Sequence, residues 1–116
     1  MKLYLYQIDA FTDKVFGGNP ACVIPLHKWL EDEKLLKIAQ ENAVSETAFF
    51  VQNDDFFHLR WFTPDIEMDL CGHATLAAAY VIKKYLKFPK DVIPFKSLSG
   101  KLNVHVNDEN FTLDFP

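Results

Sequence analysis

The sequence lacks a basic stripe, a long apolar run and a cysteine framework. Its 12 Lys and Arg residues against 16 Asp and Glu give a formal net charge of −4, so a phosphate-neutralising nucleic-acid surface is not expected. No stretch approaches the roughly 18 apolar residues of a membrane span. The two cysteines have no framework spacing, and the N-terminus has no signal-peptide core. Together these absences predict a cytoplasmic protein without nucleic-acid or membrane partners.

Metal and cofactor motifs are also missing. The four histidines and two cysteines include no His pair at i,i+4 spacing, no Cys-x-x-Cys and no His-Glu-x-x-His. Gly17-Gly18 lacks the third glycine and the helix of a dinucleotide-binding loop, and no Gly-x-Ser-x-Gly elbow occurs. We therefore expect neither a metal nor a cofactor.

The residues that are present predict one α+β domain. The chain has 116 residues, of which 49% are hydrophobic, enough for a real core. Residues 31–43 have an amphipathic helical pattern, whereas residues 74–86 are apolar nearly all round, which predicts an enclosed helix. Strand patterns cover residues 3–11, 21–24, 47–52, 57–62, 66–70, 101–106 and 111–115. Without βαβ alternation, this order predicts a strongly curved mixed or antiparallel sheet, a half-barrel around a central buried helix.

Glu46 is the first candidate for chemistry. Period-two alternation places it on the same strand face as Val44, Ala48 and Phe50, so its carboxylate leaves the chain among apolar neighbours. Loss of hydration favours the protonated form of a carboxylate, as a proton-shuttling group near neutral pH requires. The alternative is a glutamate at a strand start that simply points to water.

The second candidate is Cys71-Gly72-His73, at the start of the enclosed helix. Free N–H groups at a helix N-terminus, with a glycine that permits close approach, attract a carboxylate or phosphate. The helix dipole favours a neutral His73 and a reactive Cys71 thiol. The alternatives are a tight turn at Gly72, a core histidine and an inert buried cysteine. Asn19, in Gly17-Gly18-Asn19-Pro20, either presents its amide to a ligand or only forms a turn.

Several motifs, in this order, resemble the PhzF-like isomerase family of phenazine biosynthesis, which has the diaminopimelate-epimerase-like fold. They are Asp9-Ala10-Phe11-Thr12, Gly18-Asn19-Pro20-Ala21, Ser45-Glu46-Thr47-Ala48-Phe49, Phe62-Thr63-Pro64 with Glu67, Cys71-Gly72-His73-Ala74-Thr75-Leu76-Ala77-Ala78-Ala79, and Ser99-Gly100-Lys101-Leu102. The Ser-Glu-Thr and Gly-His-Ala-Thr pieces at this separation are the specific ones.

The resemblance implies a cofactor-independent isomerase of small carboxylated substrates. In the phenazine enzyme, the Glu that matches Glu46 moves a proton between carbons of a dihydro-hydroxyanthranilate. Groups that match Gly72 and His73, with help near Ser45 and Asn19, hold the substrate. The resemblance covers only the N-terminal half of the family's two similar halves, so the expected partner is a missing C-terminal half or a second copy of the chain.

Two other hypotheses stay open at this point. In the related epimerases a catalytic cysteine occupies the position that Cys71 matches, so a thiol-dependent epimerase or racemase is one of them. The other is a non-catalytic truncated or split domain that serves as a structural module or forms a homodimer.

Overall fold

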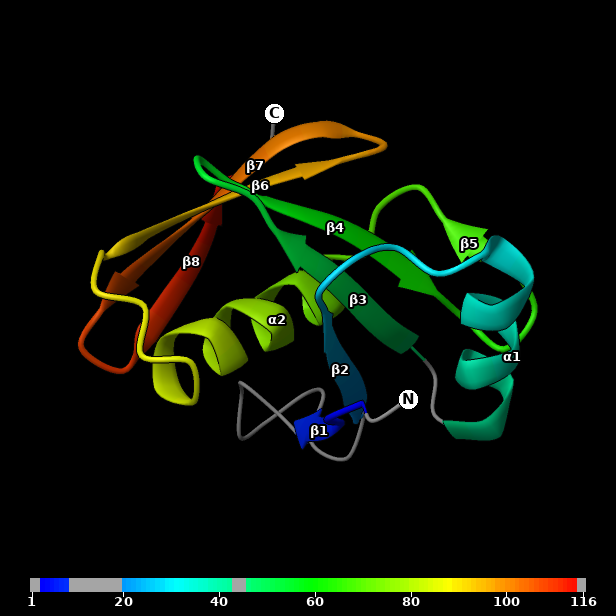
Figure 1. Cartoon of the computed structure of the whole chain (residues 1–116). Helices are drawn as coiled ribbons and strands as arrows, with labels where there is room; N and C mark the ends of the chain where they lie inside the picture. The colour runs from blue at the N-terminus through cyan, green and yellow to red at the C-terminus, as the bar shows by residue number, and fades with distance from the viewer. Residues whose placement is uncertain (1–2, 9–19, 43–45, 115–116) are drawn as a thin grey trace.

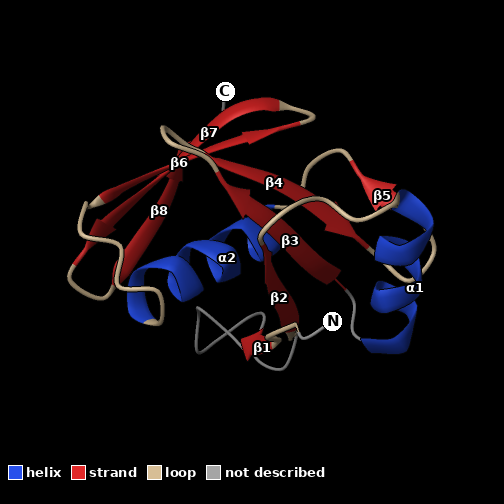
Figure 2. Ribbon diagram, in the orientation of Figure 1, coloured by secondary structure: helices blue, strands red, loops and turns tan. Residues whose placement is uncertain are grey.

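One mixed sheet and two helices make up the part of the chain that the structure describes, residues 3–8, 20–42 and 46–114 of a computed structural model (Figures 1 and 2). The strands are β1 (Tyr6–Ile8), β2 (Ala21–Leu26), β3 (Glu46–Gln52), β4 (Phe57–Phe62), β5 (Glu67–Met68), β6 (Val92–Ser97), β7 (Gly100–Asn107) and β8 (Asn110–Asp114). The helices are α1 (Asp32–Asn42) and α2 (Gly72–Lys84). The strand order is β1-β2-β3-β4-β6-β7-β8, and β5 pairs with β4.

The sheet curves around α2, as expected from the apolar sequence of that helix (Figure 1). Three successive alanines, Ala77, Ala78 and Ala79, are all fully buried, which occurs only when a helix is enclosed on several sides. Their small side chains allow the surrounding strands to approach the helix closely. The α+β half-barrel with a central buried helix is therefore confirmed, although the helix covers Gly72–Lys84 rather than residues 74–86.

The other face of the sheet is covered by α1. Alternate residues of β3 point to opposite faces, so Ala48 and Phe50 join the core around α2, whereas Phe49 and Val51 join a second core with Leu35 of α1. The predicted helix is confirmed over Asp32–Asn42, residue 43 being outside the described residues, and the predicted hairpin of β3 and β4 is confirmed as well.

The expectation of no βαβ alternation is wrong. β2 and β3 are adjacent and parallel, and α1 lies between them in the sequence. β4 and β6 are also adjacent and parallel, with β5 and α2 between them in the sequence. Parallel neighbours require a long crossover, and here each helix belongs to one. The continuously buried run of β2 is typical of a strand covered on both faces, and it was the local sign of a parallel neighbour.

Two strand predictions also need correction. β6 was not predicted, because Pro94 in its middle removes a ladder donor and weakens a strand pattern. The first strand was expected to be apolar on both faces over residues 3–11. Its described part is only Tyr6–Ile8, and the preceding Tyr4 and Leu5 are exposed. Residues 9–11 lie outside the described residues.

Candidate active site

Glu46 is the first residue of β3, and its side chain lies close to the start of α2. Its Oε1 atom is 3.6 Å from Sγ of Cys71, the residue immediately before α2. The side chain is half-buried and lies on the strand face of Ala48 and Phe50, as the period-two pattern predicts. The carboxylate therefore meets the N-terminus of the enclosed helix instead of leaving the sheet toward bulk water.

Cys71 occupies the N-cap position of α2 in an extended conformation, with φ −146° and ψ 100°, and its side chain makes no cap hydrogen bond. Burial raises the pKa of the thiol to about 11, and the negative charge of Glu46 acts in the same direction. The nearby N–H groups of Ala74 and His73 lower that pKa only in part. At neutral pH the thiol is protonated, contrary to the reactive thiol that the helix dipole alone predicts.

Thr75 fixes the first turn of α2. Its hydroxyl donates to the carbonyl of Cys71 at 2.7 Å and accepts a hydrogen bond from the indole N–H of Trp61 in β4 at 2.9 Å. Thr75 and Trp61 are both fully buried. The chain of hydrogen bonds from β4 to the carbonyl of Cys71 therefore holds the helix start relative to the sheet.

The segment between β4 and α2 is held by hydrogen bonds near both of its ends. The hydroxyl of Thr63 accepts hydrogen bonds from the N–H groups of Asp65 and Ile66, both at 3.1 Å, which forms a turn after β4. The hydroxyl of Ser99, in the β6–β7 turn, donates to the carbonyl of Asp69 at 2.7 Å. Two of the sequence motifs thus position the segment that leads to Cys71.

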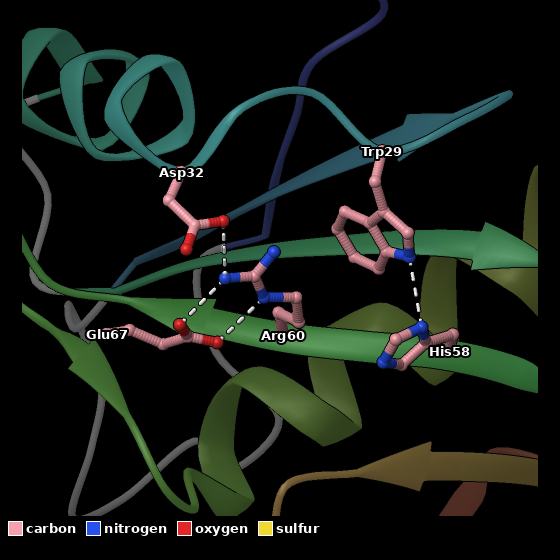
Figure 3. A network of polar contacts seen from close by, with 5 residues as sticks. All are labelled: Trp29, Asp32, His58, Arg60 and Glu67. Carbon is pink, nitrogen blue, oxygen red and sulfur yellow. Dashed lines mark hydrogen bonds and ion pairs between the residues drawn. The ribbon is translucent and has the colours of Figure 1, made fainter.

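Arg60 and Glu67 form a third attachment, on the α1 face of the sheet (Figure 3). Nε and Nη2 of Arg60 each lie 2.8 Å from one carboxylate oxygen of Glu67, a bidentate pair that joins β4 to β5. Nη2 also donates to Asp32 at the start of α1 at 3.0 Å, and the guanidinium lies 5.2 Å from the ring centroid of Trp29. The hydrogen bonds to Glu67 raise the pKa of Arg60 and keep it charged.

We expect Arg60→Met to lower the free energy of unfolding by about 2 kcal/mol, because it leaves the mostly buried carboxylate of Glu67 unpaired. The matched control is Asp32→Asn, which removes the exposed partner of the same arginine and should cost at most about 0.5 kcal/mol. Urea denaturation followed by circular dichroism measures both. Equal losses in the two variants would contradict the importance of the bidentate pair.

His58 accepts a hydrogen bond at Nδ1 from the indole N–H of Trp29, at 2.9 Å. An indole N–H only donates, so Nδ1 is unprotonated in this contact. Burial, and then the charge of Arg60, lower the pKa of His58, while Glu67 acts in the opposite direction. Protonation of His58 is therefore less favourable in the folded than in the unfolded protein.

We expect stability to fall by about 1 kcal/mol as pH drops below the ordinary histidine pKa of about 6.5, because the unfolded chain binds the proton first and the Trp29 hydrogen bond is lost. His58→Asn keeps an acceptor that does not titrate, so its free energy of unfolding should change less between pH 7 and pH 5. Urea titrations at several pH values test this, with His27→Asn as the control. If the free energy of unfolding of His58→Asn depended on pH as strongly as that of wild type, the role of His58 would be contradicted.

The predicted site residues divide into two groups. The structure brings Glu46 next to Cys71, which leads into Gly72 and His73, both half-buried in the first turn of α2. Asn19 and Ser45 lie outside the described residues, so their roles stay predictions. Sequence reasoning missed the supporting side chains, namely Arg60, Trp61, Thr63, Thr75 and Ser99. Thr63, Thr75 and Ser99 stand inside the quoted motifs, so the signal was present.

Two observations concern other kinds of site. Among the described residues, no group of three or more His, Cys, Asp or Glu side chains is placed to hold a metal ion. Neither helix in the described part of the chain is long and apolar enough to span a bilayer.

Several known proteins are similar to this chain over nearly its whole length. An uncharacterized isomerase of Pseudomonas aeruginosa is 51% identical over 116 residues, which are 100% of this chain and 45% of that protein. The crystal structure of a phenazine biosynthesis protein of the PhzF family from Enterococcus faecalis matches with a TM-score of 0.90 and 49% identity, over 97% of this chain and 43% of that chain. This chain therefore spans less than half the length of these relatives.

A more distant structure shares the fold. A hydroxyproline epimerase from Agrobacterium vitis matches with a TM-score of 0.64 at 11% identity, over 94% of this chain and 40% of that chain. The diaminopimelate-epimerase-like half-barrel expected from the sequence is thus confirmed. The model of the phenazine biosynthesis-like protein family matches residues 8–114, and the chain belongs to that family.

Proposed function

We propose that this chain supplies the N-terminal half of the active site of a cofactor-independent isomerase, in which Glu46 moves a proton between two carbons of a small carboxylated substrate. The observation that carries the proposal is the placement of the Glu46 carboxylate against the N-terminus of α2, 3.6 Å from Cys71. A relative that is 51% identical over the whole chain is named an isomerase, which supports the reaction class.

The start of α2 and the side chain of Glu46 have complementary roles: the first binds the substrate and the second transfers the proton. The backbone N–H groups and the positive dipole end at the start of α2, a helix of 13 residues, attract a carboxylate near Gly72 and His73. A substrate carboxylate bound there presents its carbon skeleton to Glu46. Asn19 and Ser45 are proposed as further substrate ligands, as the family resemblance implies.

The proposed step needs no other reagent. The Glu46 carboxylate takes a proton from one carbon, and the electron pair of that C–H bond moves into the adjacent unsaturated system. Glu46, now a carboxylic acid whose proton exchanges with solvent water, gives a proton to the second carbon, so the substrate is isomerised without net oxidation or reduction. A half-buried carboxylate with a fixed neighbour is suited to this exchange.

The thiol-dependent epimerase hypothesis is less well supported. A thiol acts as a base or nucleophile in its thiolate form. Burial and the Glu46 charge raise the pKa of Cys71 to about 11, so only a very small fraction is thiolate at neutral pH. We therefore assign the proton transfer to Glu46.

The remainder of the site is proposed to come from a segment that completes the length of the relatives, or from a second copy of this chain. This chain covers 43% of the Enterococcus faecalis protein. A chimera that joins residues 1–116 to the remaining portion of that protein would supply such a segment, while this chain alone tests the second copy and the non-catalytic alternative.

The test is isomerisation in D₂O by this chain alone and by the chimera, with dihydro-hydroxyanthranilate and a panel of small cyclic and α-amino carboxylates as substrates. We expect turnover without added cofactor, unaffected by a chelator, with solvent deuterium entering one carbon of the product. Turnover that depends on an added nucleotide or metal ion would contradict the proposal.

A further inference from the structure

We propose, building on the proposed function, that Cys71 is a positioning residue for Glu46, whose thiol donates its S–H to Oε1 and thereby directs Oε2 toward the substrate. The residue takes no proton from the substrate and forms no bond to it. Its contribution is to hold the carboxylate in one orientation before the substrate arrives.

The first support is the geometry of the pair. Sγ of Cys71 and Oε1 of Glu46 are 3.6 Å apart, within hydrogen-bond range for sulfur, and the two residues come from different elements, 25 positions apart in the chain. Cys71 is 8% exposed. The Sγ atom lies near the N–H groups of Ala74 and His73, and its hydrogen is directed to the Glu46 carboxylate.

The second support is the rigid backbone of Cys71. Its carbonyl accepts hydrogen bonds from both the N–H and the hydroxyl of Thr75, at 3.0 Å and 2.7 Å. Thr75 is in turn held by Trp61. A thiol on a backbone fixed in this way has few orientations. A hydrogen bond from it therefore holds the Glu46 carboxylate at a set position relative to β4 and α2.

The third support is the protonation state. Burial, and to a smaller extent the carboxylate of Glu46, raises the pKa of Cys71 to about 11. The thiol thus keeps its hydrogen at neutral pH and can donate it to Oε1 of Glu46, which is the direction of the contact in the structure.

The first experiment measures the coupling without any substrate. Cys71 and Cys22 are alkylated with iodoacetamide at pH 8, and each is followed by mass spectrometry of its peptide in wild type, Glu46→Gln and Asp69→Asn. Removing the Glu46 charge lowers the thiol pKa, so Cys71 should react about threefold faster in Glu46→Gln, since the gain in thiolate is partly offset by its lower nucleophilicity. Asp69→Asn, a carboxylate two residues away, is the matched control and should leave the rate unchanged.

The buried Cys22 reports on folding in the same sample. An unchanged Cys71 rate in a folded Glu46→Gln protein would overturn the proposal. If Glu46→Gln unfolds, which faster Cys22 alkylation reveals, the infrared S–H stretching band of Cys71 in a Cys22→Ala protein decides. A band at lower frequency than in the urea-unfolded chain supports the hydrogen bond, and an unshifted band overturns it.

The second experiment uses the isomerase assay. Cys71→Ala should lower kcat about fivefold, the value of one hydrogen bond, and leave KM within about twofold, whereas Cys71→Ser keeps a donor and should retain at least about half of the wild-type kcat. A wild-type kcat in Cys71→Ala would overturn the positioning role. If no protein isomerises any substrate, the proposed function fails, while the alkylation and infrared results still decide whether the thiol and the carboxylate are coupled.

Discussion

Replacement of Glu46 by glutamine is expected to lower the rate of isomerisation by about 10³-fold, within the range of about 10²–10⁴ for loss of a general acid–base group. Glutamine has the size and shape of glutamate and still accepts a hydrogen bond from Cys71, but its amide cannot take a proton from carbon. The initial rate of deuterium incorporation by the chimera in D₂O, at saturating substrate, measures the loss.

The control for this prediction separates the position of the carboxylate from its presence. Glu46→Asp keeps the carboxylate but withdraws it by one methylene, so we expect an intermediate loss of about 10–100-fold. Far-UV circular dichroism and the melting temperature of both variants should match wild type, because Glu46 lies at the start of β3 and is only half-buried. Glu46→Gln activity within twofold of wild type would remove Glu46 from the mechanism.

Thr75→Val is expected to lower the free energy of unfolding by about 2–3 kcal/mol. Valine fills the same volume but leaves the buried indole N–H of Trp61 without an acceptor, and an unsatisfied buried donor costs about 1–3 kcal/mol. The hydrogen bond from the hydroxyl to the carbonyl of Cys71 is lost as well, although the N–H of Thr75 still reaches that carbonyl. Urea denaturation monitored by tryptophan fluorescence measures the change.

Thr75→Ser is the matched control, because it keeps the hydroxyl and removes only a methyl group from a fully buried site. We expect it to cost about 1 kcal/mol. If Thr75 stabilises the fold mainly through the packing of its methyl group and not through its hydroxyl, the valine variant should be more stable than the serine variant. That order would refute the idea that the Trp61–Thr75–Cys71 hydrogen bonds hold the start of α2.

These hydrogen bonds belong to a set of contacts that together position one short segment. The Thr63 turn, the Arg60–Glu67 pair and the Ser99 bond to the carbonyl of Asp69 hold the chain from β4 to Cys71, and Thr75 holds the helix that follows. Side-chain contacts from β4, α2 and the β6–β7 turn thus converge on the residues before α2. A substrate carboxylate at α2 would meet a helix end whose position is set from several sides.

The local elements were accessible from the sequence because their signals are local. The apolar, alanine-rich run of α2 identified an enclosed helix, the amphipathic pattern identified α1, and period-two alternation identified the hairpin of β3 and β4. Period-two alternation also placed Glu46 on the face that packs against α2. Each of these depends on the backbone geometry of neighbouring residues, which a single sequence contains.

The pairing of distant segments depended on tertiary structure. The parallel pairs β2–β3 and β4–β6 form across crossovers, so nothing local shows which strands meet, and the proline in β6 concealed that strand. The sequence by itself determined the helices, the hairpin and the residue types of the candidate site. Only the tertiary structure decided that the Glu46 carboxylate meets a buried, protonated Cys71 thiol, because that contact joins two elements 25 residues apart and the thiol pKa depends on the burial they create together.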